Sequence, residues 1–188
     1  MKVSDSSLIY FERNKLYRTL PFKRLILNLG CGSGSFPKFY PHTNSFIVNI
    51  DIGEEKAGYP AYGLKHKTFE GFLEATKNDW RFSNRQASVL DLYRVPDKLF
   101  EMVICGQLIE HFEMKDIELI LSETYRVLDD NGLFQCDTVT DKYEGIKEHK
   151  TTFTLDSLQY LLDRFNLEKK TCVEFADGKA IWSLYQKR

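Results

Sequence analysis

Short runs of apolar residues alternate with helical stripes along the chain. Five runs predict strands, at 25–29, 46–50, 87–90, 100–105 and 133–137. Two further strands are predicted near the carboxyl terminus, at about 170–175 and 180–185, because Asp177-Gly178 between them is typical of a hairpin turn. Strands that alternate with helices predict an α/β fold with a mainly parallel sheet.

Apolar residues at helical spacing predict two amphipathic helices. One covers about 114–128 and is stopped by a turn at 129–132. The other covers 155–165, with Thr154 as its N-cap and Asp156 in its first turn. A third stripe, between Leu8 and Leu20, predicts a helix that either packs on the sheet or forms a lid over the site. We also expect a loop at 53–67 and a helix at 70–77.

Composition places the chain among ordinary globular proteins. Its 188 residues predict a single domain, 1–188, in which 1–24 form a helical cover or lid and 25–188 form the core. A formal net charge of -1 provides no global electrostatic case for nucleic acid or an anionic membrane as partner. No apolar run approaches the ~18 residues that a membrane span needs. The sequence does not determine the oligomeric state.

The titratable and sulfur-bearing side chains carry no metal pattern. The four cysteines form no CxxC pair, which favours buried, reduced thiols in a cytoplasmic protein. No cluster of His, Asp and Glu has the spacing of metal ligands along the sequence, so no metal site is predicted. The four cysteines are Cys31, Cys105, Cys136 and Cys172.

A glycine-rich loop directly follows the first predicted strand, at 30–34 (GCGSG). Glycines allow a ligand to approach the backbone closely, and ligands of parallel sheets bind at the carboxyl ends of strands. The dinucleotide fingerprint G-x-G-x-x-G fits neither register, because its third position falls on Ser35 or Pro37. The loop therefore indicates a nucleoside ligand without a diphosphate.

Acidic residues follow the next two predicted strands. Asp51 lies 19 residues after Gly32, where a carboxylate is placed to accept hydrogen bonds from both ribose hydroxyls. Asp91 is placed to accept from the exocyclic amine of an adenine, with the backbone amide of Leu92 donating to the ring. Three such features at three successive strand ends predict a site for an adenosine-containing ligand.

Several of these motifs together resemble the class I S-adenosylmethionine-dependent methyltransferases. The resemblance covers about residues 25–167 and is strongest for the small members found among sugar and cell-surface polysaccharide enzymes. The chain departs from the family pattern at Asn28, at Glu101 and in the turn 129–132. The segments that carry the resemblance are LNLGCGSG at 27–34, NID at 49–51, VLDL at 89–92, FEMVICGQLIEHF at 100–112 and YRVLDDNGL at 125–133.

The resemblance implies a Rossmann-like fold and S-adenosylmethionine as cofactor. The expected sheet has seven mostly parallel strands, helices on both faces and an antiparallel last strand. The resemblance also implies the cofactor-binding residues: Gly30, Cys31 and Gly32 at the amino-acid portion and adenosine, Asp51 at the ribose, Ile52 on the adenine, Asp91 and Leu92 at the adenine edge, and Cys105, Gly106 and Gln107 near the sulfonium.

The acceptor side is suggested by polar residues after the later strands. Methyl transfer is an in-line displacement, and a hydroxyl acceptor also needs its proton removed. His111, at the ligand end of the fourth strand, is the candidate general base, although it could equally order its loop. Asp137, which ends the fifth strand, and Tyr143, Glu148 and His149 in the following loop are candidate acceptor contacts.

The expected function is methyl transfer to a small-molecule or sugar/glycan acceptor, most favourably to a hydroxyl group. Two alternatives remain: a noncatalytic S-adenosylmethionine-binding regulatory domain, and an NAD-dependent oxidoreductase, which the glycine spacing disfavours. The Asn/Asp-Pro-Pro-Tyr motif of enzymes that methylate nucleic-acid bases is missing after the fourth strand, so nucleic acid is not the expected partner.

Overall fold

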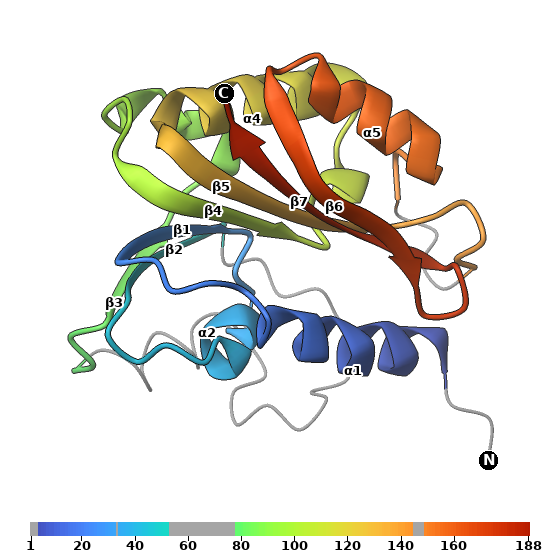
Figure 1. Cartoon of the computed structure of the whole chain (residues 1–188), viewed down its shortest axis with the longest axis horizontal. Coiled ribbons are helices and arrows are strands. Elements are labelled where there is room, and N and C mark those ends of the chain that lie inside the picture. Colours follow the sequence, from blue (N-terminus) through green and yellow to red (C-terminus); the bar gives the residue numbers. More distant parts are fainter. Residues whose placement is uncertain (1–3, 33, 53–77, 145–148) are drawn as a thin grey trace.

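The computed structural model describes residues 4–32, 34–52, 78–144 and 149–188. Seven strands form one sheet in the order β3-β2-β1-β4-β5-β7-β6, and β7 runs antiparallel to both of its neighbours (Figure 1). The predicted mostly parallel sheet with an antiparallel C-terminal hairpin is confirmed. The strands are β1 Leu25–Leu29, β2 Phe46–Asp51, β3 Phe82–Gln86, β4 Phe100–Gly106, β5 Leu128–Val139, β6 Leu167–Phe175 and β7 Ala180–Lys187.

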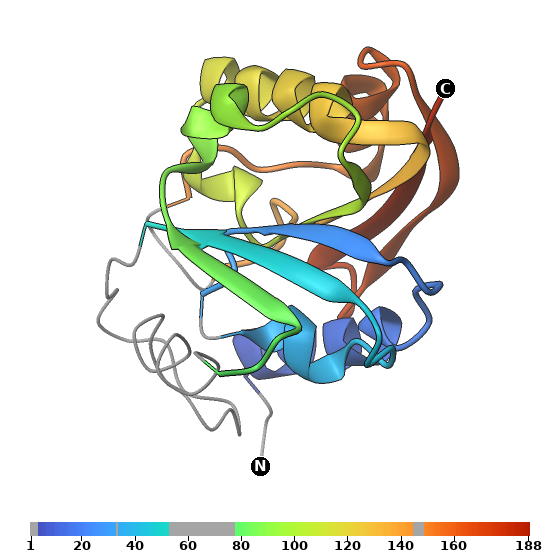
Figure 2. The same ribbon diagram turned by 90° about the vertical axis from the view of Figure 1, so that its left-hand side faces the viewer.

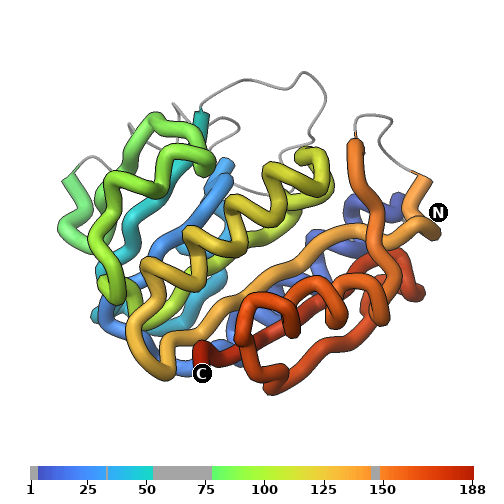
Figure 3. Tube along the Cα trace, turned by 90° about the horizontal axis from the view of Figure 1, so that it is seen from above, coloured from blue at the N-terminus to red at the C-terminus, as the bar shows by residue number. Residues whose placement is uncertain are grey.

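Helices cover both faces of the sheet, as expected. On one face lie α1 (Asp5–Tyr17) and α2 (Ser35–Phe39), and on the other lie α4 (Met114–Val127) and α5 (Leu155–Asp163) (Figure 2). Seen from above, α4 and α5 lie across the same face of the sheet (Figure 3). Each face therefore has its own apolar layer, one beneath α4 and α5 and the other beneath α1 and α2.

Both amphipathic helices form where their stripes predict them. Ile117, Ile120 and Leu121 of α4 are fully buried against the sheet. Thr154 caps α5 in a capping box. Its hydroxyl accepts a hydrogen bond from the Ser157 backbone amide, and the Ser157 hydroxyl accepts one from the Thr154 backbone amide. The positions of the two helices were thus readable from apolar spacing and one capping residue.

The third predicted strand is misplaced. The strand comprises Phe82–Gln86, and Val89–Arg94 is a 3-10 helix, η1. The Ser88 hydroxyl accepts a hydrogen bond from the Leu90 backbone amide at 3.1 Å, which starts this helix. Because β3 lies at the sheet edge and pairs only with β2, its side chains are half-buried or exposed and show no apolar run.

Strand β5 is longer than its prediction at both ends. It begins at Leu128, so the turn expected at 129–132 lies inside the strand. Asn131 has φ 63°, a left-handed conformation that asparagine tolerates well, and the pairing with β4 shifts register nearby. The predicted turn at Asp177-Gly178 is confirmed, since both residues are left-handed between β6 and β7.

The amino-terminal helix α1 packs on the sheet as a cover. Ile9 and Tyr17 are buried, and Glu12 accepts from the Ala176 backbone amide at 2.7 Å. Lys179 donates to Asp5 at 2.6 Å, so the helix is also tied to the hairpin of β6 and β7. The loop expected at 53–67 and the helix expected at 70–77 lie outside the described residues. Among the residues that are described, no helix has the length and apolar character needed to cross a membrane.

Candidate functional site

The glycine loop follows β1 and is hydrogen-bonded to the carboxyl end of β2. Gly30 and Gly32 have φ values of 60° and 50°, which favour glycine over any other residue. The Gly32 backbone amide donates to Asp51 Oδ2 at 2.8 Å, and the Cys31 amide donates to the Ile50 carbonyl at 3.2 Å. The predicted proximity of Asp51 and the glycine loop is therefore present in the structure.

The space available for a side chain differs between Gly30 and Gly32 of the loop. A Cβ atom at Gly30 would lie 2.6 Å from Leu108 Cδ1, whereas one at Gly32 would meet nothing within 4 Å among the described residues. The loop therefore packs tightly against the segment after β4 and is open at Gly32. An open, glycine-lined backbone next to a carboxylate fits the adenosine and amino-acid portions of S-adenosylmethionine.

A pocket of about 710 Å³ opens between the end of β2, β3 and η1. Its volume lies in the range of about 300–1,000 Å³ that is common for small-molecule sites. Ile50 forms one wall, and the predicted Asp91 and Leu92 line another through η1. Asp91 is exposed and Leu92 is buried, while Ile52 follows β2 with half of its surface exposed. Of the expected adenosine contacts, Asp91 and Leu92 thus line this pocket, and Ile52 lies outside its lining.

The end of β4 contributes backbone more than side chains. Cys105 is fully buried in the apolar layer beneath α4. A Cβ atom at Gly106 would lie 2.9 Å from Asp137 Oδ2 and would contact the Tyr17 hydroxyl, so only glycine fits there. Gln107, at φ 53°, donates from its backbone amide to the Asp137 carbonyl at 2.8 Å.

Asp137 is the centre of a buried polar network. Tyr17 donates to its carboxylate at 3.2 Å and Gln135 at 3.0 Å, while Arg13 Nη1 lies 3.6 Å from it. Burial raises the pKa of Asp137, and Arg13 opposes that rise. Arg13 and Tyr17, four residues apart on α1, were not singled out in the sequence. The sequence carried one indication of this network, which is that the charged residue Arg13 lies between apolar positions of the amino-terminal stripe.

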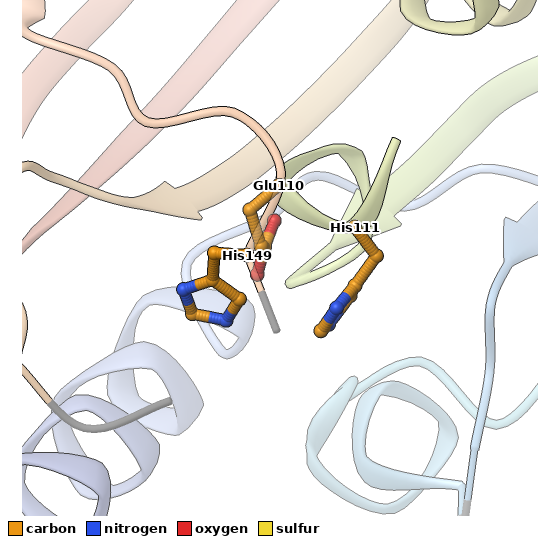
Figure 4. Close-up of side chains that lie close together, drawn as sticks. All are labelled: Glu110, His111 and His149. Carbon is orange, nitrogen blue, oxygen red and sulfur yellow. The ribbon is translucent and has the colours of Figure 1, made fainter. Parts of the chain in front are cut away.

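A second cluster lies beside this network and contains Glu110, His111 and His149 (Figure 4). The two imidazole centroids are 5.1 Å apart, and the ring of Tyr143 stacks on His149 at 5.7 Å. Glu110 is buried and accepts from the Thr138 hydroxyl at 2.9 Å. Burial raises the pKa of Glu110 to about 8.

The structure thus brings together three of the residues expected on the acceptor side: His111, Tyr143 and His149. Glu148 lies outside the described residues. Glu110 was not recognised as a functional residue, although its position next to His111 was a signal. Leu108 packs against Gly30 of the glycine loop and immediately precedes the 3-10 helix η2 (Ile109–His111), so it lies between the loop and His111.

Comparison with known proteins agrees with this geometry. The family model described as a methyltransferase domain matches residues 27–136, which include the glycine loop, η1, η2 and most of β5. No curated protein sequence matches the chain.

Solved structures share the fold at low sequence identity. The N-methyltransferase NodS from Bradyrhizobium japonicum WM9 is 14% identical, with a TM-score of 0.71, over 94% of this chain and 95% of that one. A 1,6-didemethyltoxoflavin-N1-methyltransferase from Burkholderia thailandensis is 12% identical, with a TM-score of 0.75, over 98% and 79%. An O-methyltransferase family protein from the same organism is 11% identical, with a TM-score of 0.72, over 95% and 56%.

The family match spans more than half of the chain, and the fold agrees with it. The resemblance seen in the sequence is therefore confirmed at the level of the family, while the closer similarity to sugar-pathway members stays a prediction. The chain belongs to the methyltransferase domain family, has the fold of class I S-adenosylmethionine-dependent methyltransferases and has S-adenosylmethionine as its cofactor.

Proposed function

We propose that the chain transfers a methyl group to a hydroxyl of a small-molecule or sugar/glycan acceptor in the cytoplasm. The observation that carries the proposal is the cluster of Glu110, His111 and His149, which supplies ionisable groups at the strand ends next to the cofactor loop. A hydroxyl needs such a group because its proton must leave, whereas more nucleophilic acceptors need less help. The four cysteines, none of which is in a disulfide, support the cytoplasmic location.

The cofactor side is assigned to the residues around the open loop. When bound, S-adenosylmethionine supplies a methyl group on a positively charged sulfur. Gly30, Cys31 and Gly32 give its amino-acid portion and adenosine access to the backbone, and Asp51 holds the ribose. Ile52 would pack against the adenine, Asp91 and Leu92 would bind its edge, and the backbone of Cys105, Gly106 and Gln107 at the end of β4 would line the sulfonium region.

The acceptor side is assigned to the residues at the ends of β4 and β5. His111 activates the acceptor hydroxyl as a general base. His149 and Tyr143 contact the acceptor from the loop after β5, because their stacked rings lie next to His111. Asp137 orients Gln107, which lies between the cofactor side and the acceptor side. The backbone amide of Gln107 donates a hydrogen bond to the Asp137 carbonyl, and its side-chain amide donates one to the Asp137 carboxylate.

Cofactor binding tests the first half of this assignment. We expect calorimetric titration to give micromolar affinity for S-adenosylmethionine and S-adenosylhomocysteine and no binding of NAD. Asp51→Ala removes a charge-assisted contact of about 1.5–3 kcal/mol, so the affinity for both sulfur ligands falls about 10- to 150-fold. Asp130→Ala is the matched control. That carboxylate is exposed near the start of β5, at the strand end opposite the glycine loop, and pairs with Lys98.

Turnover tests the second half. We expect S-adenosylhomocysteine to form from S-adenosylmethionine only when a hydroxyl-bearing acceptor, drawn from a panel of nucleotide sugars, glycans and small alcohols, is present. Tight cofactor binding without turnover on any acceptor would favour the regulatory-domain alternative. Binding of NAD in place of the sulfur ligands would contradict the assignment and favour an oxidoreductase.

A further inference from the structure

The cluster of Glu110, His111 and His149 combines donor atoms that are far apart in the sequence. One donor atom from each residue lies within 4.8 Å of the other two. Figure 4 shows the side chains of Glu110, His111 and His149 converging from two segments of the chain. Two imidazole nitrogens and one carboxylate oxygen form a donor set that suits first-row transition metals better than Mg²⁺ or Ca²⁺, which prefer oxygen alone.

Hydrogen bonds hold the two segments of the cluster together. The backbone amides of Lys150 and Thr151 donate to the Glu110 carbonyl at 2.8 and 3.2 Å. The Thr151 hydroxyl donates to the Phe112 carbonyl at 2.8 Å. His149 is thus held beside η2 by its own neighbours in the chain. The hydroxyl of Thr138 orients the Glu110 carboxyl group, as outer partners of metal ligands commonly do.

The local charge also favours a cation. Glu110 and Asp137 are both buried carboxyl groups, at 1% and 0% exposure. Arg13, 3.6 Å from Asp137, brings one positive charge to this pair of acids. An ionised Glu110 would be costly in this buried position without opposite charge, and a bound divalent ion would provide that charge.

We propose that Glu110, His111 and His149 bind a divalent first-row transition-metal ion, such as Zn²⁺, and leave open positions for water or an acceptor oxygen. Metal–ligand distances of ~2.0–2.2 Å place neighbouring donors ~3 Å apart, so rotation of the side chains brings the three donors into range. This inference rests on the proposed function and deepens it: the ion would polarise the acceptor hydroxyl, whose proton would pass to a water molecule, and His111 would be a ligand of the ion instead of taking that proton directly.

Metal binding by the whole chain tests the proposal. After dialysis against a chelator, the protein is titrated with Co²⁺ and followed by its visible d–d absorption, and bound Zn²⁺ is counted by elemental analysis. We expect about one ion per chain for each metal and no competition from equimolar Mg²⁺. His149→Ala and Glu110→Gln each weaken binding by ~100-fold or more, because loss of even an outer partner costs about 10- to 100-fold.

The controls separate a ligand role from a structural one. Glu110→Gln keeps an oxygen that can accept from Thr138, so its thermal unfolding reports whether the fold is intact. His42→Ala removes a histidine that contacts the Leu20 carbonyl, away from the cluster, and leaves metal affinity unchanged. Absence of Co²⁺ binding by the unmodified chain, or equal affinity in the Glu110 and His149 variants, overturns the proposal. Titration with S-adenosylmethionine is independent of this result, so failure of the metal site and failure of the methyltransferase assignment are distinguishable.

Discussion

Asp137→Ala is expected to lower the free energy of unfolding by about 3–5 kcal/mol. The substitution leaves the buried guanidinium of Arg13 without its carboxylate and removes the acceptor of the Tyr17 hydroxyl and the Gln135 amide. Breaking a buried ion pair from one side costs about this much because an uncompensated charge remains. Urea unfolding followed by circular dichroism measures the change.

The matched control is Asp97→Ala, which removes an exposed carboxylate paired with Arg126. We expect it to cost about 0–1 kcal/mol, since solvent screens surface ion pairs. In a double-mutant cycle, Arg13→Ala should cost less in the Asp137→Ala background than in the unmodified chain. A loss below about 1 kcal/mol for Asp137→Ala would contradict a role for this network in fastening α1 to the sheet.

His111→Ala is expected to lower kcat by about 10²- to 10⁴-fold on the acceptor that the turnover screen identifies. A positioned group that handles the proton of a hydroxyl contributes a factor of this size. The affinity for S-adenosylmethionine stays the same, because the assigned cofactor contacts lie around the glycine loop. Steady-state kinetics and calorimetry on the same preparation measure the two effects.

The control for this prediction is His42→Ala, with unchanged turnover. An activity of His111→Ala above about one third of the original value would contradict the assignment. Chelation distinguishes the two ways in which His111 can act: a metal-free chain keeps its activity if the imidazole is itself the base, and loses it if the imidazole works through an ion. Restoration by Zn²⁺ in the original chain, but not in His149→Ala, completes the comparison.

Much of the fold was predictable because the central strands are buried on both faces. Apolar runs therefore mark β1, β2 and β4 without ambiguity, and the glycines at 30–34 mark the backbone turn that follows β1. The edge strand β3 was missed for the opposite reason, since its half-exposed side chains need no apolar pattern. The start of β5 was missed because Asp-Asp-Asn-Gly is common in turns, whereas here these four residues form an irregularity inside the strand, between the pairs that Leu128 and Leu133 make with β4.

The proximity of Asp51 to the glycine loop could also be predicted from the sequence. Asp51 follows β2, and parallel pairing of β1 with β2 requires that their carboxyl ends meet, so its contact with Gly32 follows from the order of motifs. Asp91 was placed at a strand end, but it lies in η1, where it still lines the pocket. Although the strand was misplaced, Asp91 still lies near the carboxyl end of β3, because η1 follows β3 closely in the chain.

By itself, the sequence determined the α/β fold, the family and the glycine loop after β1, because each rests on residues close together in the chain. Only the tertiary structure decided which polar residues share a site. Arg13 reaches Asp137 because α1 packs across the sheet, and His149 reaches Glu110 because its segment is hydrogen-bonded beside η2. Such groupings depend on contacts between distant segments, and local patterns of hydrophobic and polar residues carry no record of them.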